Sequence, residues 1–267
     1  MPFTASHAAA ALPLHRWLGR YGVLSALVIG CCVPDLPYFL PLGVSRQVSH
    51  SAFGLFYYCL PAGLVCYFLF HTILKQPLLL LLPPQIGSRL VDPACLTQRL
   101  PTVPWLALAV SLLAGAASHL VWDSFTHADG AAVKALGLQQ PLFVVYDYTV
   151  YRYSLLQHAS SVLGLLLLWR AGARWLANAP PFPLPAAWST QQRWLVIIAI
   201  IVAAGAGAGM LAMQIVPSSL GLQGVRMAIG KTSIAALRSL GVSILLYGLA
   251  WQIWRFGNAA AERADKL

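Results

Sequence analysis

The residues with the clearest chemical potential stand in one stretch, residues 118–127, which reads Ser-His-Leu-Val-Trp-Asp-Ser-Phe-Thr-His. The stretch continues an apolar run, residues 105–117, that predicts a helix. Because residues four apart stack on one face of a helix, His119 and Asp123 point the same way, and His127 joins them if the helix persists for another turn. Two imidazoles and a carboxylate at this spacing suit a divalent metal such as zinc.

This motif lies at the end of a segment that is apolar enough to sit in a lipid bilayer. Ionisable side chains are costly to place there and are usually functional. The competing interpretation is a polar helix end at the membrane surface, in which His119 only forms a hydrogen bond. The spacing of His119, Asp123 and His127 together favours the metal site.

The composition indicates an integral membrane protein. Of 267 residues, 59% are hydrophobic and only 9% are charged, whereas about a quarter are charged in a soluble domain. The net charge of +10 comes from basic residues scattered in loops. Because no basic cluster is interleaved with aromatic residues, we expect membrane lipids as partners and no nucleic acid.

The apolar segments predict an all-α fold, a polytopic membrane helix bundle of five to six spans. The expected spans are residues 52–74, 104–122, 155–169, 194–216 and 234–254, with 75–103 and 128–153 as loops. We expect a site domain over 1–170, a Pro-rich linker over 171–193 and a two-helix scaffold over 194–267. In the scaffold, Gly205 and Gly209 are spaced for close helix packing or for a homo-oligomer contact.

Two arrangements of the N-terminal segment remain open. Pro34 and Pro37 end a helix on either side of Asp35. A helical hairpin of 6–18 against 21–33 would return Asp35 towards His7. The alternative is a single span from about 21 to 42, with Asp35 near its far end.

The distribution of basic residues predicts the orientation in the membrane. With the spans above and the hairpin, eleven basic residues fall on one side, which should be cytoplasmic, and five on the other. The opposite side then receives most of the candidate ligands, which are Asp35, His50, His119, Asp123, His127 and His158. His7 joins them only if the hairpin forms.

These residues resemble an uncharacterised family of bacterial integral membrane proteins. The resemblance covers about residues 1–170 and is carried by Met1-Pro-Phe-Thr-Ala-Ser-His7, Pro34-Asp35, His50-Ser51, residues 118–127 and Gln157-His158. That family is similar to membrane-bound metal-dependent hydrolases. It is more distantly similar to the zinc-dependent phospholipase C and P1 nuclease family. The resemblance implies a multi-pass protein of the bacterial inner membrane.

The resemblance also implies roles for the candidate ligands. Asp35, His50, His119 and Asp123 would bind one metal, and Asp123 would bridge to a second metal that His7 also binds. His127 and His158 would contribute to a third site or support the first two.

Two departures favour a reduced site of one or two metals. Six residues precede His7, so a ligand from the N-terminal amine is not expected. The third site of the phospholipases uses a glutamate, whereas the only glutamate here is Glu262, which leaves Asp129 or Asp147 as substitutes.

The leading hypothesis is a metal-dependent phosphoester hydrolase that acts on a lipid-linked or periplasmic substrate. Clustered divalent ions bind phosphoryl oxygens and acidify a bound water, and Asp35 or Asp123 could act as general base. One rival is a non-catalytic membrane protein that binds metal for structure or transport. The other is an adaptor or regulatory subunit without metal.

Overall fold

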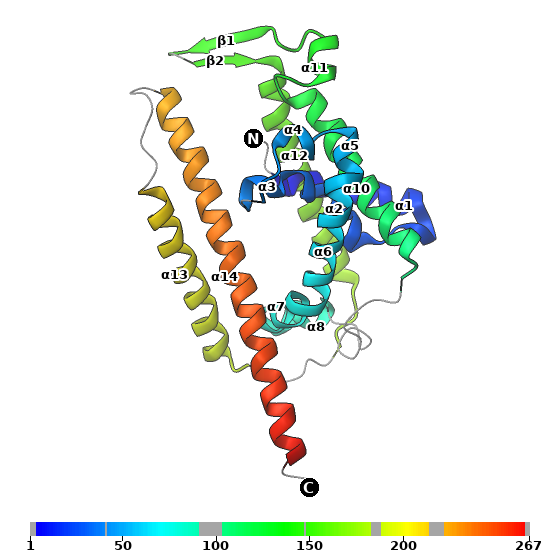
Figure 1. Cartoon of the computed structure of the whole chain (residues 1–267), viewed down its shortest axis with the longest axis vertical. Coiled ribbons are helices and arrows are strands. Elements are labelled where there is room, and N and C mark those ends of the chain that lie inside the picture. Colours follow the sequence, from blue (N-terminus) through cyan, green and yellow to red (C-terminus); the bar gives the residue numbers. More distant parts are fainter. Residues whose placement is uncertain are drawn as a thin grey trace. The chain divides into compact units, whose positions relative to one another are not determined.

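Helices dominate the chain, as the all-α prediction requires (Figure 1). The computed structural model describes residues 4–40, 42–90, 103–146, 148–182, 188–213 and 222–264. Within these ranges, β structure is limited to one two-stranded hairpin. The fold class predicted from the apolar segments is therefore confirmed.

Four helices in the described part of the chain are long and apolar enough to cross a membrane, as expected for an integral membrane protein. They are Ala52–Leu81, Trp105–Ala135, Thr190–Ala212 and Met227–Gly257. The span expected at 155–169 lies instead within α12 (Arg152–Asn178). That helix is long, but its apolar section is shorter than the roughly 20 residues that a bilayer requires, so the described residues contain four span-length helices where five to six were expected.

The chain forms two compact units. The first comprises Met1–Tyr67, Thr102–Arg174 and Val216–Lys231, and the second comprises Phe68–Pro101, Trp175–Ile215 and Thr232–Leu267. All the candidate ligands belong to the first unit. The division into a site domain, linker and scaffold stays a prediction.

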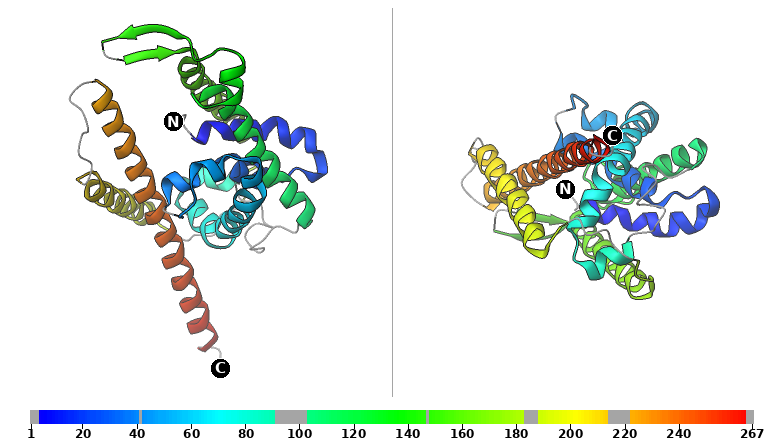
Figure 2. Two further views of the ribbon diagram at one scale, coloured as in Figure 1. Left: turned by 45° about the horizontal axis from the view of Figure 1, so that its top comes forward. Right: turned by 90° about the horizontal axis from the view of Figure 1, so that it is seen from below.

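In the first unit, the N-terminal segment folds as a helical hairpin. Its elements are η1 (Thr4–Ala10), α1 (Ala11–Leu18), η2 (Gly19–Tyr21), α2 (Leu24–Cys32), η3 (Val33–Asp35) and α3 (Leu36–Phe39). The chain reverses between α1 and α2 (Figure 2). The Thr4 hydroxyl donates a 2.6 Å hydrogen bond to Oδ2 of Asp35. The hairpin interpretation is correct, and the single span from about 21 to 42 is wrong.

Helix α2 packs against α10 (Trp105–Thr126) at a separation that only glycine permits. A Cβ atom on Gly30 would clash with the carbonyl oxygen of Leu112, and one on Gly115 would clash with that of Leu27. The two glycines therefore bring the helix backbones into contact. This contact fixes the position of α2 along the axis of α10, and with it the position of Asp35, which follows α2.

The hairpin turn is also fixed to α10. The buried Ser111 hydroxyl accepts a 2.9 Å hydrogen bond from the Val23 amide and donates a 3.0 Å bond to the Tyr21 carbonyl. These bonds satisfy backbone groups that the turn leaves without a helical partner. They therefore prevent α2 from sliding along α10.

Of the remaining elements of the first unit, η4 (Leu55–Cys59) and α11 (Ala131–Ala135) contact α10. The segment after α3 contains α4 (Arg46–Ser49), α5 (Ala52–Gly54) and the π-helical turn η4, which leads into α6 (Leu60–Leu69). The loop expected at 128–153 instead contains α11, β1 (Pro141–Val145) and β2 (Tyr148–Tyr151). The strands pair antiparallel, with Val145 opposite Tyr148. β-Branched and aromatic residues, which favour strands, are common in both.

In the second unit, the loop expected at 75–103 is helical at its start. The π-helical turn η5 (Phe70–Leu74) continues into α7 (Lys75–Leu81), and α8 (Pro84–Leu90) follows. Pro77 cannot donate to the Ile73 carbonyl four residues earlier. Gln252 of α14 (Leu222–Ala264) compensates, because its amide donates to the carbonyls of Thr72 at 2.8 Å and Ile73 at 3.3 Å.

The glycines of α13 (Thr190–Ala212) differ in what they contact. A Cβ atom on Gly207 would meet the Ser239 side chain of α14, so this glycine permits close packing of the two helices. The space beside Gly205 and Gly209 is open. Their expected role in packing within the chain is therefore wrong, and a homo-oligomer contact through them stays a prediction.

The contact between α2 and α10 makes the effect of Gly115→Ala predictable. The added methyl group meets backbone atoms, which cannot move away by a rotamer change, so we expect unfolding to become easier by about 1–3 kcal/mol. Thermal unfolding in detergent measures the change. Gly172→Ala on α12 is the matched control, because nothing lies near its Cβ position, and it should leave stability unchanged or slightly raised. Equal effects of the two substitutions would contradict the close-packing argument.

Candidate metal centre

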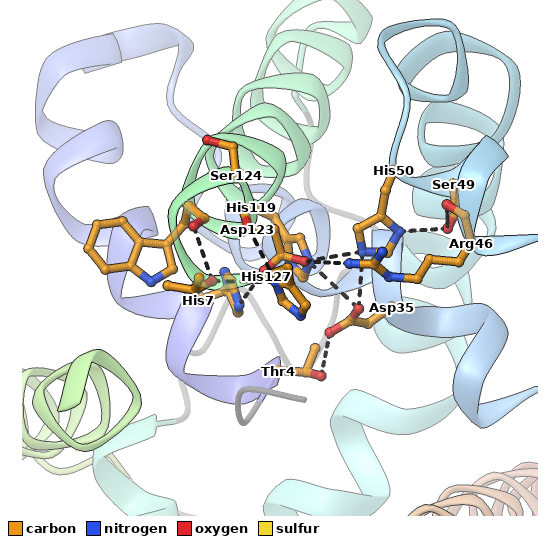
Figure 3. A network of polar contacts seen from close by, with 12 residues as sticks. Thr4, His7, Asp35, Arg46, Ser49, His50, His119, Asp123, Ser124 and His127 are labelled. Atoms are coloured by element: carbon orange, nitrogen blue, oxygen red, sulfur yellow. Dashed lines mark hydrogen bonds and ion pairs between the residues drawn. The ribbon is translucent and has the colours of Figure 1, made fainter. Parts of the chain in front are cut away.

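Four side chains of the first unit converge on one small volume. One ligand atom from each of Asp35, His50, His119 and Asp123 lies within 4.8 Å of all the others (Figure 3). Three of these residues are buried, and the side chain of His50 is only 9% exposed. This group, called the first ligand set below, could hold a metal ion.

Local structure explains how each side chain is aimed. His119 and Asp123 lie one turn apart on α10, so the spacing predicted from the sequence is confirmed. Asp35 ends the short η3 turn, which Val33 starts and which has Pro34 at its second position. His50 follows α4, whose first turn is capped by the Ser45 hydroxyl.

The distances within the first ligand set match those around a tetrahedral metal. Nε2 of His50 lies 3.3 Å from Oδ1 of Asp35 and 3.4 Å from Oδ2 of Asp123. Nε2 of His119 lies 3.6 Å and 3.5 Å from the same two oxygens. Charge-assisted hydrogen bonds are shorter, about 2.7–2.9 Å. Ligands about 2.0–2.2 Å from a zinc ion at the tetrahedral angle are about 3.3–3.6 Å apart.

The second oxygen of Asp123 faces a different pair of imidazoles. Oδ1 lies 3.6 Å from Nε2 of His7 and 3.3 Å from Nδ1 of His127. The His7 ring also stacks on the His119 ring, with centroids 3.9 Å apart. We call His7, His127 and Asp123 the second ligand set. Asp123 belongs to both sets, through one oxygen each.

Several buried atoms of the two sets have no hydrogen-bond partner in the described structure. They are Nε2 of His7, His50 and His119 and Oδ1 of Asp123. An unsatisfied buried polar atom costs about 1–3 kcal/mol, so four in one place call for a ligand. Imidazole nitrogens and carboxylate oxygens are donors that zinc and related divalent ions accept. The residues present therefore fit a metal ion.

Hydrogen bonds behind the first set orient its ligands. Nδ1 of His119 lies 2.7 Å from the Cys31 carbonyl, and since a carbonyl can only accept, Nδ1 carries a proton, which in the neutral imidazole leaves the lone pair on Nε2. Nδ1 of His50 lies 2.9 Å from the Ser49 hydroxyl, and Thr4 donates to Asp35. Such outer partners fix the tautomer and direction of metal ligands.

The titration of the ligands outside the membrane spans reflects the same environment. Burial, followed by the nearby His119, lowers the pKa of His7 to about 4, so His7 is neutral at pH 7. Burial would raise the pKa of Asp35, but contacts with His119 and His50 outweigh it and hold that pKa well below its usual range. Burial opposes protonation of His50, but Asp123 and Asp35 outweigh it and raise its pKa.

The other predicted site residues lie at different places relative to the two ligand sets. His127 is the C-cap residue of α10 and joins the second set through Nδ1, which also lies 3.3 Å from the backbone carbonyl of Asp123. His158 is an exposed residue of α12 and is not among the four converging ligands, and its role as a ligand stays a prediction. Asp129 pairs with Arg46. Asp147 lies outside the described residues.

Sequence reasoning did not identify Arg46, Thr4 or Ser49 as site residues. Arg46 reaches Asp123, with Nη2 3.8 Å from Oδ2. Thr4 and Ser49 act through Asp35 and His50. For Thr4 and Ser49 the only available signal was adjacency to motif residues, since serine and threonine are common in any loop.

Sharing of Asp123 between the two sets predicts the effect of Asp123→Asn. The neutral amide keeps the shape of the Asp123 side chain but cannot offset the charge of two dications. We therefore expect the purified variant to lose more than one metal ion per protein molecule. Asp35→Asn affects only the first ligand set, so this variant should lose about one metal ion per protein molecule. Metal analysis of the two variants beside the parent measures this, with His71→Ala of the second unit as control. Full metal retention in Asp123→Asn would contradict a shared ligand.

The raised pKa of His50 predicts a pH dependence of opposite sign with and without metal. Metal binding must displace the His50 proton, so affinity should rise from about pH 6 to 8 with proton release. In the metal-free protein, the stability contributed by protonated His50 is present below about pH 6.5 and is lost as the pH rises through its raised pKa. Calorimetry in buffers of different ionisation enthalpy measures the released protons. Affinity that is independent of pH would contradict His50 as a ligand.

Comparison with known proteins yields a family but no activity. No curated protein and no solved structure matches the chain. A family model described as a domain of unknown function, DUF4184, matches residues 1–249. The expectation of an uncharacterised family is thus confirmed, while its relation to metal-dependent hydrolases stays a prediction. Because the match covers nearly the whole chain, the protein belongs to the DUF4184 family.

Proposed function

We propose that this protein is a membrane-bound metal-dependent phosphoester hydrolase that binds zinc. The observation that carries the proposal is the division of Asp123 between two ligand sets, Oδ2 to the first and Oδ1 to the second. A carboxylate in this position is suited to bridge two divalent ions. Paired ions are a common means of phosphoester hydrolysis.

The two ligand sets differ in completeness. Asp35, His50, His119 and Asp123 provide four protein ligands, the number that closes a tetrahedral structural zinc site. The second set provides three, His7, His127 and Asp123, the number that leaves a position open for water or substrate in catalytic zinc sites. The second set therefore supports catalysis, with the first set as its rigid neighbour.

Charge balance supports an anionic substrate. The buried carboxylates of Asp35 and Asp123 offset the charge of one divalent ion. A second ion would leave two positive charges without compensation in a mostly buried site, since His7 is neutral at pH 7. A phosphoester supplies negative charge at that place, which a neutral ester does not.

The chain's own residues supply positioning and proton transfer. Bound divalent ions supply electrophilic charge and an acidified water molecule. Both oxygens of Asp123 face the imidazoles of the two ligand sets, so this carboxylate would be committed to metal binding. Asp35 contributes only Oδ1 to the first set, and its Oδ2 accepts the Thr4 hydrogen bond. Of the two predicted general bases, Asp35 is therefore the one with an oxygen that is not assigned to a metal.

The level in the membrane that is expected for the site favours a lipid-linked or periplasmic substrate. His119 and Asp123 lie in the C-terminal part of α10, and His50 directly precedes the span-length helix Ala52–Leu81. The charge bias of the loops assigns this end to the non-cytoplasmic side of a bacterial inner membrane. A site at that level meets phospholipid headgroups.

A structural metal protein is the second candidate. The observation in its favour is the complete shell of the first set, which needs no further ligand to hold a zinc ion. This candidate predicts one ion and no hydrolysis. The adaptor without metal predicts neither, although the unsatisfied buried atoms argue against it.

Zinc-loaded protein in detergent should hydrolyse a chromogenic phosphodiester and a short-chain phospholipid. Activity should disappear with a chelator and return with zinc. His7→Ala should remove the second ion, retain the first and lower kcat at least about a hundredfold, because the open site is lost. His15→Ala, further along the same arm of the hairpin, is the matched control. One ion in the parent, or full activity in His7→Ala, would favour the structural metal protein.

A further inference from the structure

Arg46 places a permanent positive charge at the edge of the two ligand sets. Its Nη2 atom lies 3.8 Å from Oδ2 of Asp123, and its side chain remains 30% exposed. Figure 3 shows the guanidinium group directed towards the carboxylates of Asp35 and Asp123. Arg46 therefore contacts the site on one side and solvent on the other.

Arg46 does not serve to neutralise Asp123. The distance of 3.8 Å is too long for a hydrogen bond, and His50 and His119 lie nearer to the same oxygen, at 3.4 and 3.5 Å. A fixed cation beside a metal site also repels the metal. Its presence is favourable where an anion binds between the cation and the metal.

Asp129 occupies the outer edge of the guanidinium group. Nη1 of Arg46 donates a 2.9 Å hydrogen bond to Oδ2 of Asp129, whose side chain is 69% exposed. An exposed ion pair of this kind is weak, because water and salt screen it. A stronger anion can therefore displace Asp129 from Arg46.

We propose that Arg46, together with the open side of the His7, His127 and Asp123 set, forms an anion subsite that binds the phosphoryl oxygens of the substrate. Asp129 holds the guanidinium group in place until the anion replaces it. The subsite rests on the metal-dependent hydrolase proposed above. It extends that proposal by naming the group that recognises the substrate and a residue that competes with it.

The chemistry of arginine defines the ligand class. A planar guanidinium group donates two parallel hydrogen bonds to two oxygens of one phosphoryl group. Phosphomonoesters and phosphodiesters both carry at least two such unsubstituted oxygens. The phosphoryl group can belong to a lipid headgroup or to a soluble ester, and the experiment below separates these sources.

Binding of inorganic phosphate to the full-length protein in detergent tests the subsite. Calorimetry is run on zinc-loaded protein and on protein treated with a chelator. We expect Arg46→Gln to weaken phosphate binding at least about tenfold with unchanged zinc content and melting temperature. Arg46→Lys should recover part of the affinity, since it keeps the charge but not the planar group. Arg20→Gln, whose arginine contacts Tyr21 at the hairpin turn, is the matched control and should bind as the parent does.

The Asp129→Asn variant tests whether Asp129 competes with phosphate for Arg46 or only positions the Arg46 side chain. Loss of the competing carboxylate should strengthen phosphate binding, whereas a residue that merely positions Arg46 would weaken it when changed. Weaker binding in Asp129→Asn would therefore overturn the competing role. Parent-like phosphate affinity in Arg46→Gln, or loss of zinc from that variant, would overturn the subsite itself.

Two further comparisons identify the source of the phosphoryl group and separate the two proposals. Tighter binding of short-chain phosphatidic acid than of inorganic phosphate would support a lipid headgroup, and equal binding would support a soluble ester. A parent that binds zinc and phosphate but hydrolyses no phosphoester would end the hydrolase proposal and leave the subsite. If the parent hydrolyses phosphoesters and Arg46→Gln does so with unchanged kinetics and unchanged phosphate affinity, the hydrolase proposal would stand and the subsite would be overturned.

Discussion

Two buried carboxylates impose the main constraint on this structure. Asp35 and Asp123 are 4% and 6% exposed, and an ionised group removed from water costs several kcal/mol unless opposite charge compensates it. The surrounding imidazoles lie at 3.3–3.6 Å, too far for strong hydrogen bonds and at the right separation for ligands of a common ion. The first unit is arranged so that these charges can meet a divalent cation.

The fold satisfies this constraint through close helix packing. Gly30 and Gly115 let α2 and α10 touch, and Ser111 prevents the two helices from sliding. One residue beyond Gly30, the Cys31 carbonyl meets His119, so the same contact that packs the helices also directs a ligand. Packing and ligand geometry are therefore coupled, which is the condition for a preorganised metal site.

Much of the fold follows from local patterns in the sequence. Long apolar runs require helices in a bilayer, because only helices satisfy their own backbone groups there, and the spans on α10, α13 and α14 were predicted on that basis. The patterns failed where distant residues intervene. The helix continues past Pro77 because the Gln252 side chain donates hydrogen bonds to the carbonyls of Thr72 and Ile73, one of which Pro77 leaves without its helical donor. No local rule could predict that partner.

For the site, the sequence by itself determined the residue types and one spacing. His119 and Asp123 share a helix face because the α-helix repeats every 3.6 residues, so their pairing was predictable. Only the tertiary structure decided that His7 and Asp35 join them, because that requires the chain to reverse at the hairpin. It alone also assigned Arg46 to the site. A charged loop residue has no period that predicts its partner, and its role arises from contacts between segments far apart in the chain.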